Sequence, residues 1–217
     1  AWCAPRRFCP EFGRKRPGPP GHCCGSSRVI SEETLPNQAK QARFMDYFQT
    51  LGELVASRWQ ARQNLPQAFP EVAETVLGER GDGPEDLLQC LLTCTPEPAG
   101  SAVITLYRGV GFCVEAHCGF TALPEICQVP WGGAFQVVGG ACLNLTFDWR
   151  PHEVNSNLRT GRLTLKQARL AGFGSVHRLQ PGLTYSLVGL DPPPIFLVFR
   201  TQSSGTLWNC YPPGVAL

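Results

Sequence analysis

The spacing of apolar residues changes near residue 100, and this change constrains the fold more than any other feature. Before it, apolar side chains recur every three or four residues: Phe44, Phe48, Leu51, Val55 and Trp59. This period predicts an amphipathic helix over about 37–63. A short helix after Pro70, ending near Gly81, and a third helix beginning at Pro84 are also expected, because proline favours the first helical turn.

Beyond residue 100, short runs rich in β-branched and aromatic residues alternate with Gly and Pro, which predicts strands. The runs are Ala102–Arg108, Gly111–Ala116, Phe135–Val138, Ala141–Asp148, Leu183–Val188, Ile195–Thr201 and Thr206–Tyr211. Thr164–Leu170 is the one helix candidate in this half. The predicted class is α+β: an N-terminal extended arm, a helical segment (about 31–96), then a mostly antiparallel β sheet or sandwich (about 101–212).

Charge and composition predict three regions: a basic arm rich in Pro, Gly and Cys over 1–30, a helical region over 31–96 and a β-rich domain over 101–217. Residues 1–31 carry six basic side chains and one acidic side chain. Residues 32–97 carry five basic and eleven acidic side chains, and residues 98–217 carry eight basic and five acidic ones. The arm has too little apolar surface to order itself. We expect it to bind other protein subunits or an anionic surface (RNA, an acidic protein or membrane headgroups) through these residues: Arg6, Arg7, Arg14, Lys15 and Arg16.

The chain has 11 cysteines, an odd number that intramolecular disulfides cannot use up. Four residues of the arm have side chains suited to zinc: Cys3, Cys9, His22 and Cys23. Their spacing differs from that of zinc ribbons and fingers, in which paired ligands lie two to four residues apart. Disulfides or plain thiols are therefore the favoured interpretation, zinc is the alternative, and no other cofactor is expected.

The segment 111–118, Gly-Phe-Cys-Val-Glu-Ala-His-Cys, resembles the histidine motif of trypsin-like proteases, in which a strand delivers an Ala-His-Cys turn. The resemblance implies a catalytic triad of His117, Asp148 and Ser204. The family's Gly-Asp-Ser-Gly sequence is absent, and a triad is defined by geometry that spacing cannot supply.

Two other segments resemble pieces of fibronectin type III domains. Residues 179–185, Leu-Gln-Pro-Gly-Leu-Thr-Tyr, are similar to their tyrosine corner, and residues 145–151 are similar to a strand that carries a core Trp. The resemblance implies β structure in which the hydroxyl of Tyr185 bonds back to the backbone at a corner of a sandwich. In addition, Asn144-Leu145-Thr146 is an N-glycosylation sequon, which is a feature of secreted proteins.

Three functions are compatible with these patterns. The favoured one is a non-catalytic structural or interaction subunit of a larger intracellular or organellar assembly, docking through the basic arm and the β-rich domain. The alternative is a secreted or cell-surface β-sandwich binding module with disulfides, and the third is a Cys/Ser–His hydrolase. No apolar run reaches the ~18 residues that span a bilayer, so no transmembrane segment is expected.

Overall fold

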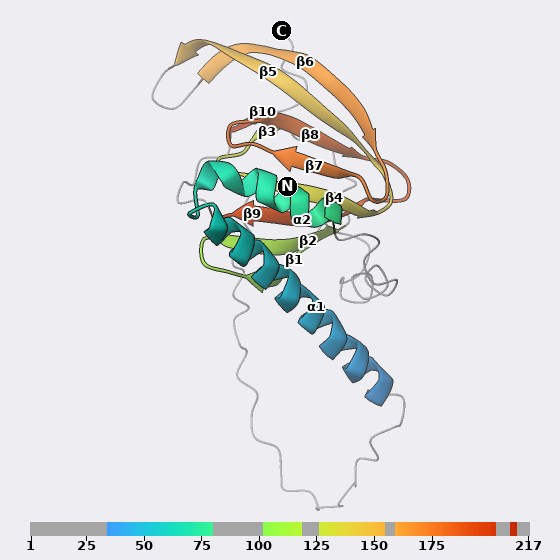
Figure 1. The fold of residues 1–217 in the computed structure, drawn as a ribbon. Coiled ribbons are helices and arrows are strands. Elements are labelled where there is room, and N and C mark those ends of the chain that lie inside the picture. Colours follow the sequence, from blue (N-terminus) through green and yellow to red (C-terminus); the bar gives the residue numbers. More distant parts are fainter. Residues whose placement is uncertain (1–33, 80–101, 119–125, 155–158, 203–208, 212–217) are drawn as a thin grey trace, which may run out of the picture.

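The computed structural model describes residues 34–79, 102–118, 126–154, 159–202 and 209–211. Within these residues, two helices precede ten strands, which confirms the α+β class (Figure 1). Helix α1 spans Thr34–Ala61, close to its predicted range, and α2 spans Phe69–Glu79 after a short 3₁₀ turn. The predicted arm over 1–30 and the helix expected after Pro84 lie outside the described residues.

The strands form two five-stranded antiparallel sheets. Sheet A has the order β1-β2-β9-β4-β7, and sheet B has the order β10-β3-β8-β5-β6. Sheet A contains β1 Ala102–Arg108, β2 Phe112–Cys118, β4 Gly133–Gly139, β7 Val176–Leu179 and β9 Ile195–Thr201. Sheet B contains β3 Ile126–Gln128, β5 Cys142–Val154, β6 Arg159–Ala171, β8 Thr184–Gly189 and β10 Asn209–Tyr211.

The strand pairs are nested along the chain: strands near the two ends of the β region pair with each other, and strands near its middle pair with each other. Strand β2 pairs with β9, β3 with β8, β4 with β7 and β5 with β6. This is the pairing of a jelly roll, an architecture of two facing sheets that includes the cupins. The sandwich implied by the fibronectin resemblance is thus present with a different topology, and Tyr185 is buried in it.

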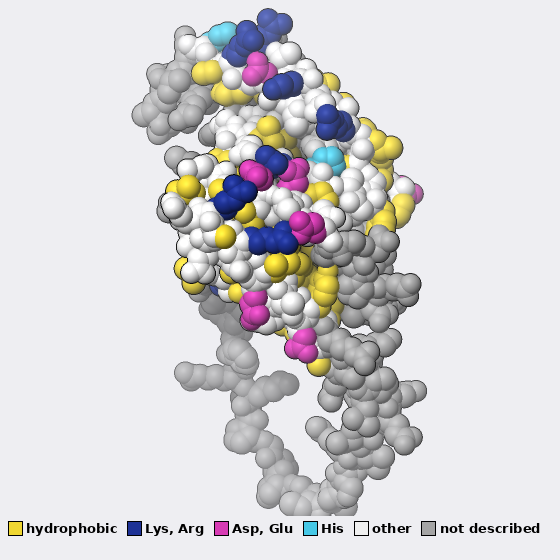
Figure 2. All heavy atoms as spheres, viewed as in Figure 1, with side chains coloured by type: hydrophobic (Ala, Val, Ile, Leu, Met, Phe, Trp, Pro, Cys, Tyr) yellow, Lys and Arg dark blue, Asp and Glu magenta, His cyan; other side chains and the backbone are white. Residues whose placement is uncertain are grey.

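One expectation about this half was wrong: Thr164–Leu170 belongs to strand β6 and is not a helix. The residues between Thr164 and Leu170 are all exposed, so no apolar face specifies their conformation locally. Pairing with β5 determines the extended conformation of this segment, and this tertiary context overrides the helical propensity of its Leu, Lys, Gln and Ala residues. Figure 2 shows Lys and Arg side chains at the end of the molecule formed by this long β5–β6 hairpin.

The two helices cover the outer face of sheet A, with α1 against β1 and β2, and α2 against β4 and β7 (Figure 1). One apolar cluster fills this interface, and it includes Phe48, Val55, Phe69, Phe112 and Phe199. A second cluster lies between the two sheets, and it includes Trp131, Phe135, Tyr185, Phe196 and Val198. Within the described part of the chain, no helix is both long and apolar enough to cross a membrane.

Close contact between β4 and β9 depends on Gly133. A Cβ atom at this position would lie 1.9 Å from the backbone carbonyl oxygen of Phe199. We therefore expect Gly133→Ala to lower the free energy of unfolding by about 3 kcal/mol. This is the upper end of the usual cost of overpacking, because the backbone of β9 must move to make room. Urea unfolding measures this. Gly172→Ala is the control, since no atom lies within 4 Å of its Cβ position; equal stability of the two variants would contradict the prediction.

Candidate functional site

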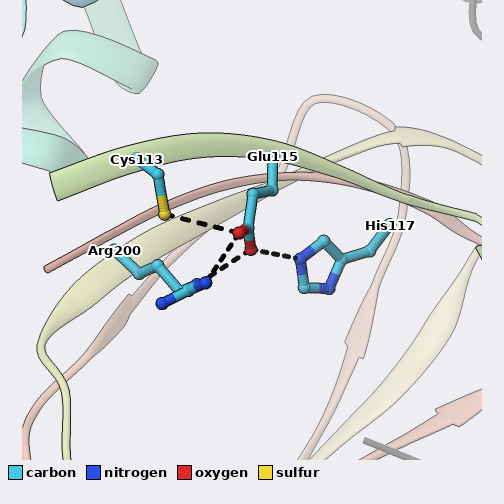
Figure 3. A network of polar contacts seen from close by, with 4 residues as sticks. All are labelled: Cys113, Glu115, His117 and Arg200. Carbon is cyan, nitrogen blue, oxygen red and sulfur yellow. Dashed lines mark hydrogen bonds and ion pairs between the residues drawn. The ribbon is translucent and has the colours of Figure 1, made fainter. Parts of the chain in front are cut away.

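Glu115 on β2 lies at the centre of a polar network of four side chains. Arg200 on β9 donates two hydrogen bonds to it, from Nε to Oε2 at 2.8 Å and from Nη2 to Oε1 at 2.7 Å. His117 Nε2 lies 3.0 Å from Oε2, and the thiol of Cys113 donates to Oε1 at 3.4 Å. Figure 3 shows the four side chains pointing toward one another.

The alternation of a β-strand places this network inside the sandwich. Phe112, Val114 and Ala116 of β2 face the helices, so the residues between them point to the other face of sheet A. Glu115 is paired with Val198 of β9, which belongs to the apolar cluster between the sheets. Cys113 is paired with Arg200, and this register brings the guanidinium to the carboxylate. The network therefore faces sheet B from within the jelly roll.

Burial determines the ionisation of these groups. Glu115 is 5% exposed and His117 is 1% exposed. Burial favours the neutral carboxyl, but hydrogen bonds from His117 and Arg200 and the charge of Arg200 lower the pKa of Glu115 to about 2. Burial lowers the pKa of His117 despite the nearby carboxylate. Burial, with the charge of Glu115, raises the pKa of the Cys113 thiol to about 12.

At neutral pH the network therefore contains a carboxylate, a guanidinium, a neutral imidazole and a thiol. A neutral His117 beside an ionised carboxylate carries its proton on Nε2, and this N–H donates a hydrogen bond to Glu115. The pair has the arrangement of a general base oriented by a carboxylate. Cys113 does not have the lowered pKa of a nucleophilic cysteine.

The residues of the implied protease triad lie in different places. His117 is in the network, whereas Asp148 is on β5 of sheet B, where its half-exposed carboxylate accepts a hydrogen bond from Arg150 at 3.3 Å. The carboxylate that contacts His117 is Glu115, and Ser204 lies outside the described residues. The zinc candidates and the predicted binding residues of the arm also lie outside them and stay predictions. They are Cys3, Cys9, His22 and Cys23, and Arg6, Arg7, Arg14, Lys15 and Arg16.

Two residues of the network were missed in the sequence. Glu115 could have been found, because Cys113, Glu115 and His117 alternate along a predicted strand and must share one face. No sequence signal identifies Arg200, which reaches the network only because β9 pairs with β2.

No protein-family model matches the chain, and no curated protein matches it. Several solved structures resemble it. Hydroquinone 1,2-dioxygenase PnpCD, in complex with Cd²⁺ and 4-hydroxybenzonitrile, is 14% identical over 52% of this chain and 71% of that one, with a TM-score of 0.38. DMSP lyase DddQ from Ruegeria pomeroyi is 12% identical over 67% of this chain and 78% of that one, with a TM-score of 0.41. Oxalate oxidase in complex with the substrate analogue glycolate is 19% identical over 59% of this chain and 65% of that one, with a TM-score of 0.36.

These neighbours correct the favoured functional expectation. The three structures named above are enzymes, so the expectation of a non-catalytic structural or interaction subunit with a role in complex assembly is not kept. The glycan implied by the sequon is also incompatible with the fold, because Asn144 is only 9% exposed and lies between the sheets. At TM-scores below 0.5, these likenesses do not identify a reaction for this chain.

The Cd²⁺ in one neighbour raises the question of whether the described residues fit a metal ion. Among them, no three or more His, Cys, Asp or Glu side chains are grouped closely enough to hold one. In the network, both carboxylate oxygens of Glu115 already accept hydrogen bonds from Arg200, a cation of the chain itself. The residues of this site therefore do not fit a metal ion.

Proposed function

We propose that the chain is an enzyme that moves a proton in a small polar substrate, with its active site in the network between the two sheets. His117 is the general base, Glu115 orients its ring and stabilises the imidazolium that forms, and Arg200 fixes the carboxylate. The observation that supports this most is the buried Glu115–His117 hydrogen bond of 3.0 Å, held by a bidentate guanidinium. Desolvated charges are costly, and clusters of shifted pKa values are typical of active sites.

The ionisation of the network supports a base that works at and below neutral pH. Because burial lowers the pKa of His117, its neutral form persists below the range in which an exposed histidine becomes protonated. The reaction we propose is removal of a proton from carbon next to a carbonyl or carboxylate, leading to isomerisation or elimination.

The test follows exchange of carbon-bound protons for deuterium by NMR, with the full chain in D₂O and a panel of small keto acids and carboxylates. We expect the wild-type protein to exchange carbon-bound protons of at least one compound in the panel. His117→Gln should lower the kcat of this exchange by about 100-fold or more, the usual contribution of a general base. His152→Gln, at an exposed histidine of β5, is the matched control and should keep the wild-type rate. Absence of exchange by wild type, or an unchanged rate in His117→Gln, would contradict the proposal.

We also propose an intracellular location. The buried Cys113 and Cys142 are free thiols, and burial raises the pKa of Cys142 to about 11, so both are protonated and unreactive. Buried thiols left unoxidised are typical of proteins from reducing compartments. Alkylation before and after reduction, read by mass spectrometry, tests this: several disulfides in the natively isolated protein would favour the secreted alternative.

A further inference from the structure

A second polar cluster lies inside the sandwich, on strands β7 and β5. His177 of β7 is paired with Phe135 of β4, and its ring stacks on that phenylalanine with centroids 5.0 Å apart and planes inclined by 22°. Asn144 of β5 faces it from the other sheet, with Nδ2 3.3 Å from His177 Nδ1. The hydrogen bond therefore joins sheet A to sheet B. Three strand spacings, about 14 Å, separate His177 from Glu115 along sheet A.

Two buried atoms of this pair have no hydrogen-bond partner among the described residues: Asn144 Oδ1 and His177 Nε2. Burial, and then the charge of Arg169, lowers the pKa of His177, so the ring is neutral. If Asn144 donates to Nδ1, the pair presents an acceptor at Oδ1 and a donor at Nε2. With the amide reversed, it presents a donor and an acceptor instead. Either way, one of the two atoms donates and the other accepts, and a hydroxyl group can pair with both kinds.

Arg169 adds an exposed positive charge next to this cluster. It is paired with Asn144 across β5 and β6, so its side chain is on the same face of sheet B. With the Gln167 amide turned so that its oxygen faces Arg169, that oxygen accepts hydrogen bonds from Nε at 2.8 Å and Nη2 at 2.9 Å. Strands β6 and β7 are the edge strands of the two sheets. Exposure decreases from Arg169 through His177 to Asn144.

We propose that Asn144, His177 and Arg169 form a binding site for a small hydroxycarboxylate. The ligand's hydroxyl engages Asn144 Oδ1 and His177 Nε2, and its carboxylate faces the guanidinium of Arg169. The stacked Phe135 holds the imidazole in place and supplies an apolar wall for the carbon chain. This site is distinct from the Glu115 network and does not depend on the proposed reaction.

The test is a titration of the full chain, labelled with ¹⁵N-histidine, by L-lactate and by propionate, which differ only in the hydroxyl group. We expect lactate to shift the His177 ring signals in a saturable way and to bind at least tenfold more tightly than propionate. Equal binding of the two acids would identify an adventitious anion site at Arg169 and overturn the proposal. Unchanged His177 signals with both acids would also overturn it, because an ordered water alone then satisfies the two atoms.

Variants separate the contribution of each side chain. Asn144→Asp keeps the size of the side chain and places a negative charge near the ligand's carboxylate, so it should weaken lactate binding more than tenfold. Arg169→Gln, at an exposed position, should weaken lactate and propionate alike without disturbing the fold. Arg162→Gln on the same strand is the matched control and should leave lactate affinity within twofold. Wild-type affinity for lactate in both Asn144→Asp and Arg169→Gln would contradict the assignment.

Discussion

Replacing Glu115 with Gln is expected to lower the free energy of unfolding by about 3–5 kcal/mol, the cost of leaving a partner of a buried ion pair without its counter-charge. The carboxylate is 5% exposed and accepts hydrogen bonds from Arg200 at 2.7 and 2.8 Å. An amide of the same size fills the space but cannot neutralise the guanidinium. Urea unfolding followed by circular dichroism measures the difference, with Asp148→Asn as the control.

The control pair is exposed and should matter little. Asp148 and Arg150 have side chains 54% and 79% exposed, and such pairs contribute about 0–1 kcal/mol. If Glu115→Gln and Asp148→Asn unfold at the same urea concentration, the network is not a buried ion pair in solution.

The same carboxylate gives the protein a defined pH dependence. Its pKa of about 2 in the folded state lies below the ordinary value of 4.5, so it stabilises the fold above pH 4.5. This contribution, about 3 kcal/mol, is lost as the pH falls from about 5 toward 2, where the folded protein also becomes protonated. Glu115→Gln should therefore show a flatter stability profile over this interval than wild type.

Phe69→Ala is the second substitution with a large expected effect, a loss of about 3–5 kcal/mol in the free energy of unfolding. Phe69 is fully buried where α1, α2 and β2 meet. Its ring lies 4.9 Å from that of Trp59 and 5.5 Å from that of Phe112, measured between centroids. Truncation leaves a cavity between the helices and the sheet, because residues on three separate elements cannot all move inward to fill it.

Leu65→Ala provides the control for this substitution, since Leu65 is 43% exposed and precedes the short 3₁₀ turn. We expect it to change the free energy of unfolding by about 0.5 kcal/mol or less. Thermal unfolding of both variants tests the claim that the helices belong to the cooperative core. A Phe69→Ala protein as stable as Leu65→Ala would show that the helices dock only weakly on sheet A.

Local sequence patterns predicted helix α1 and the strands with runs of β-branched and aromatic residues. Helix α1 has one apolar face, and strands β1 and β9 have the bounds expected from their β-branched and aromatic residues. The short strands β3 and β7, of three and four residues, are too brief to give a period, and β6 is exposed along most of its length. Their conformation depends on the strands beside them, which no local window contains.

The candidate site was predictable only in part for the same reason. Cys113, Glu115 and His117 share a face of one strand, a relation that alternation alone reveals. Arg200 is 85 residues from Glu115 in sequence, and Asn144 is 33 residues from His177. These contacts follow from strand order, and the predicted sandwich left that order open.

The position of β9 in sheet A has a consequence for how the protein is made. Strand β9 lies between β2 and β4, although it follows both of them in the chain. During synthesis, β2 and β4 therefore emerge with unpaired edges and stay so until residues 195–201 leave the ribosome. Topologies dominated by such distant pairings fold slowly and expose strand edges that aggregate. Nascent chains of this protein are expected to need chaperone protection until β9 has emerged and paired with both strands.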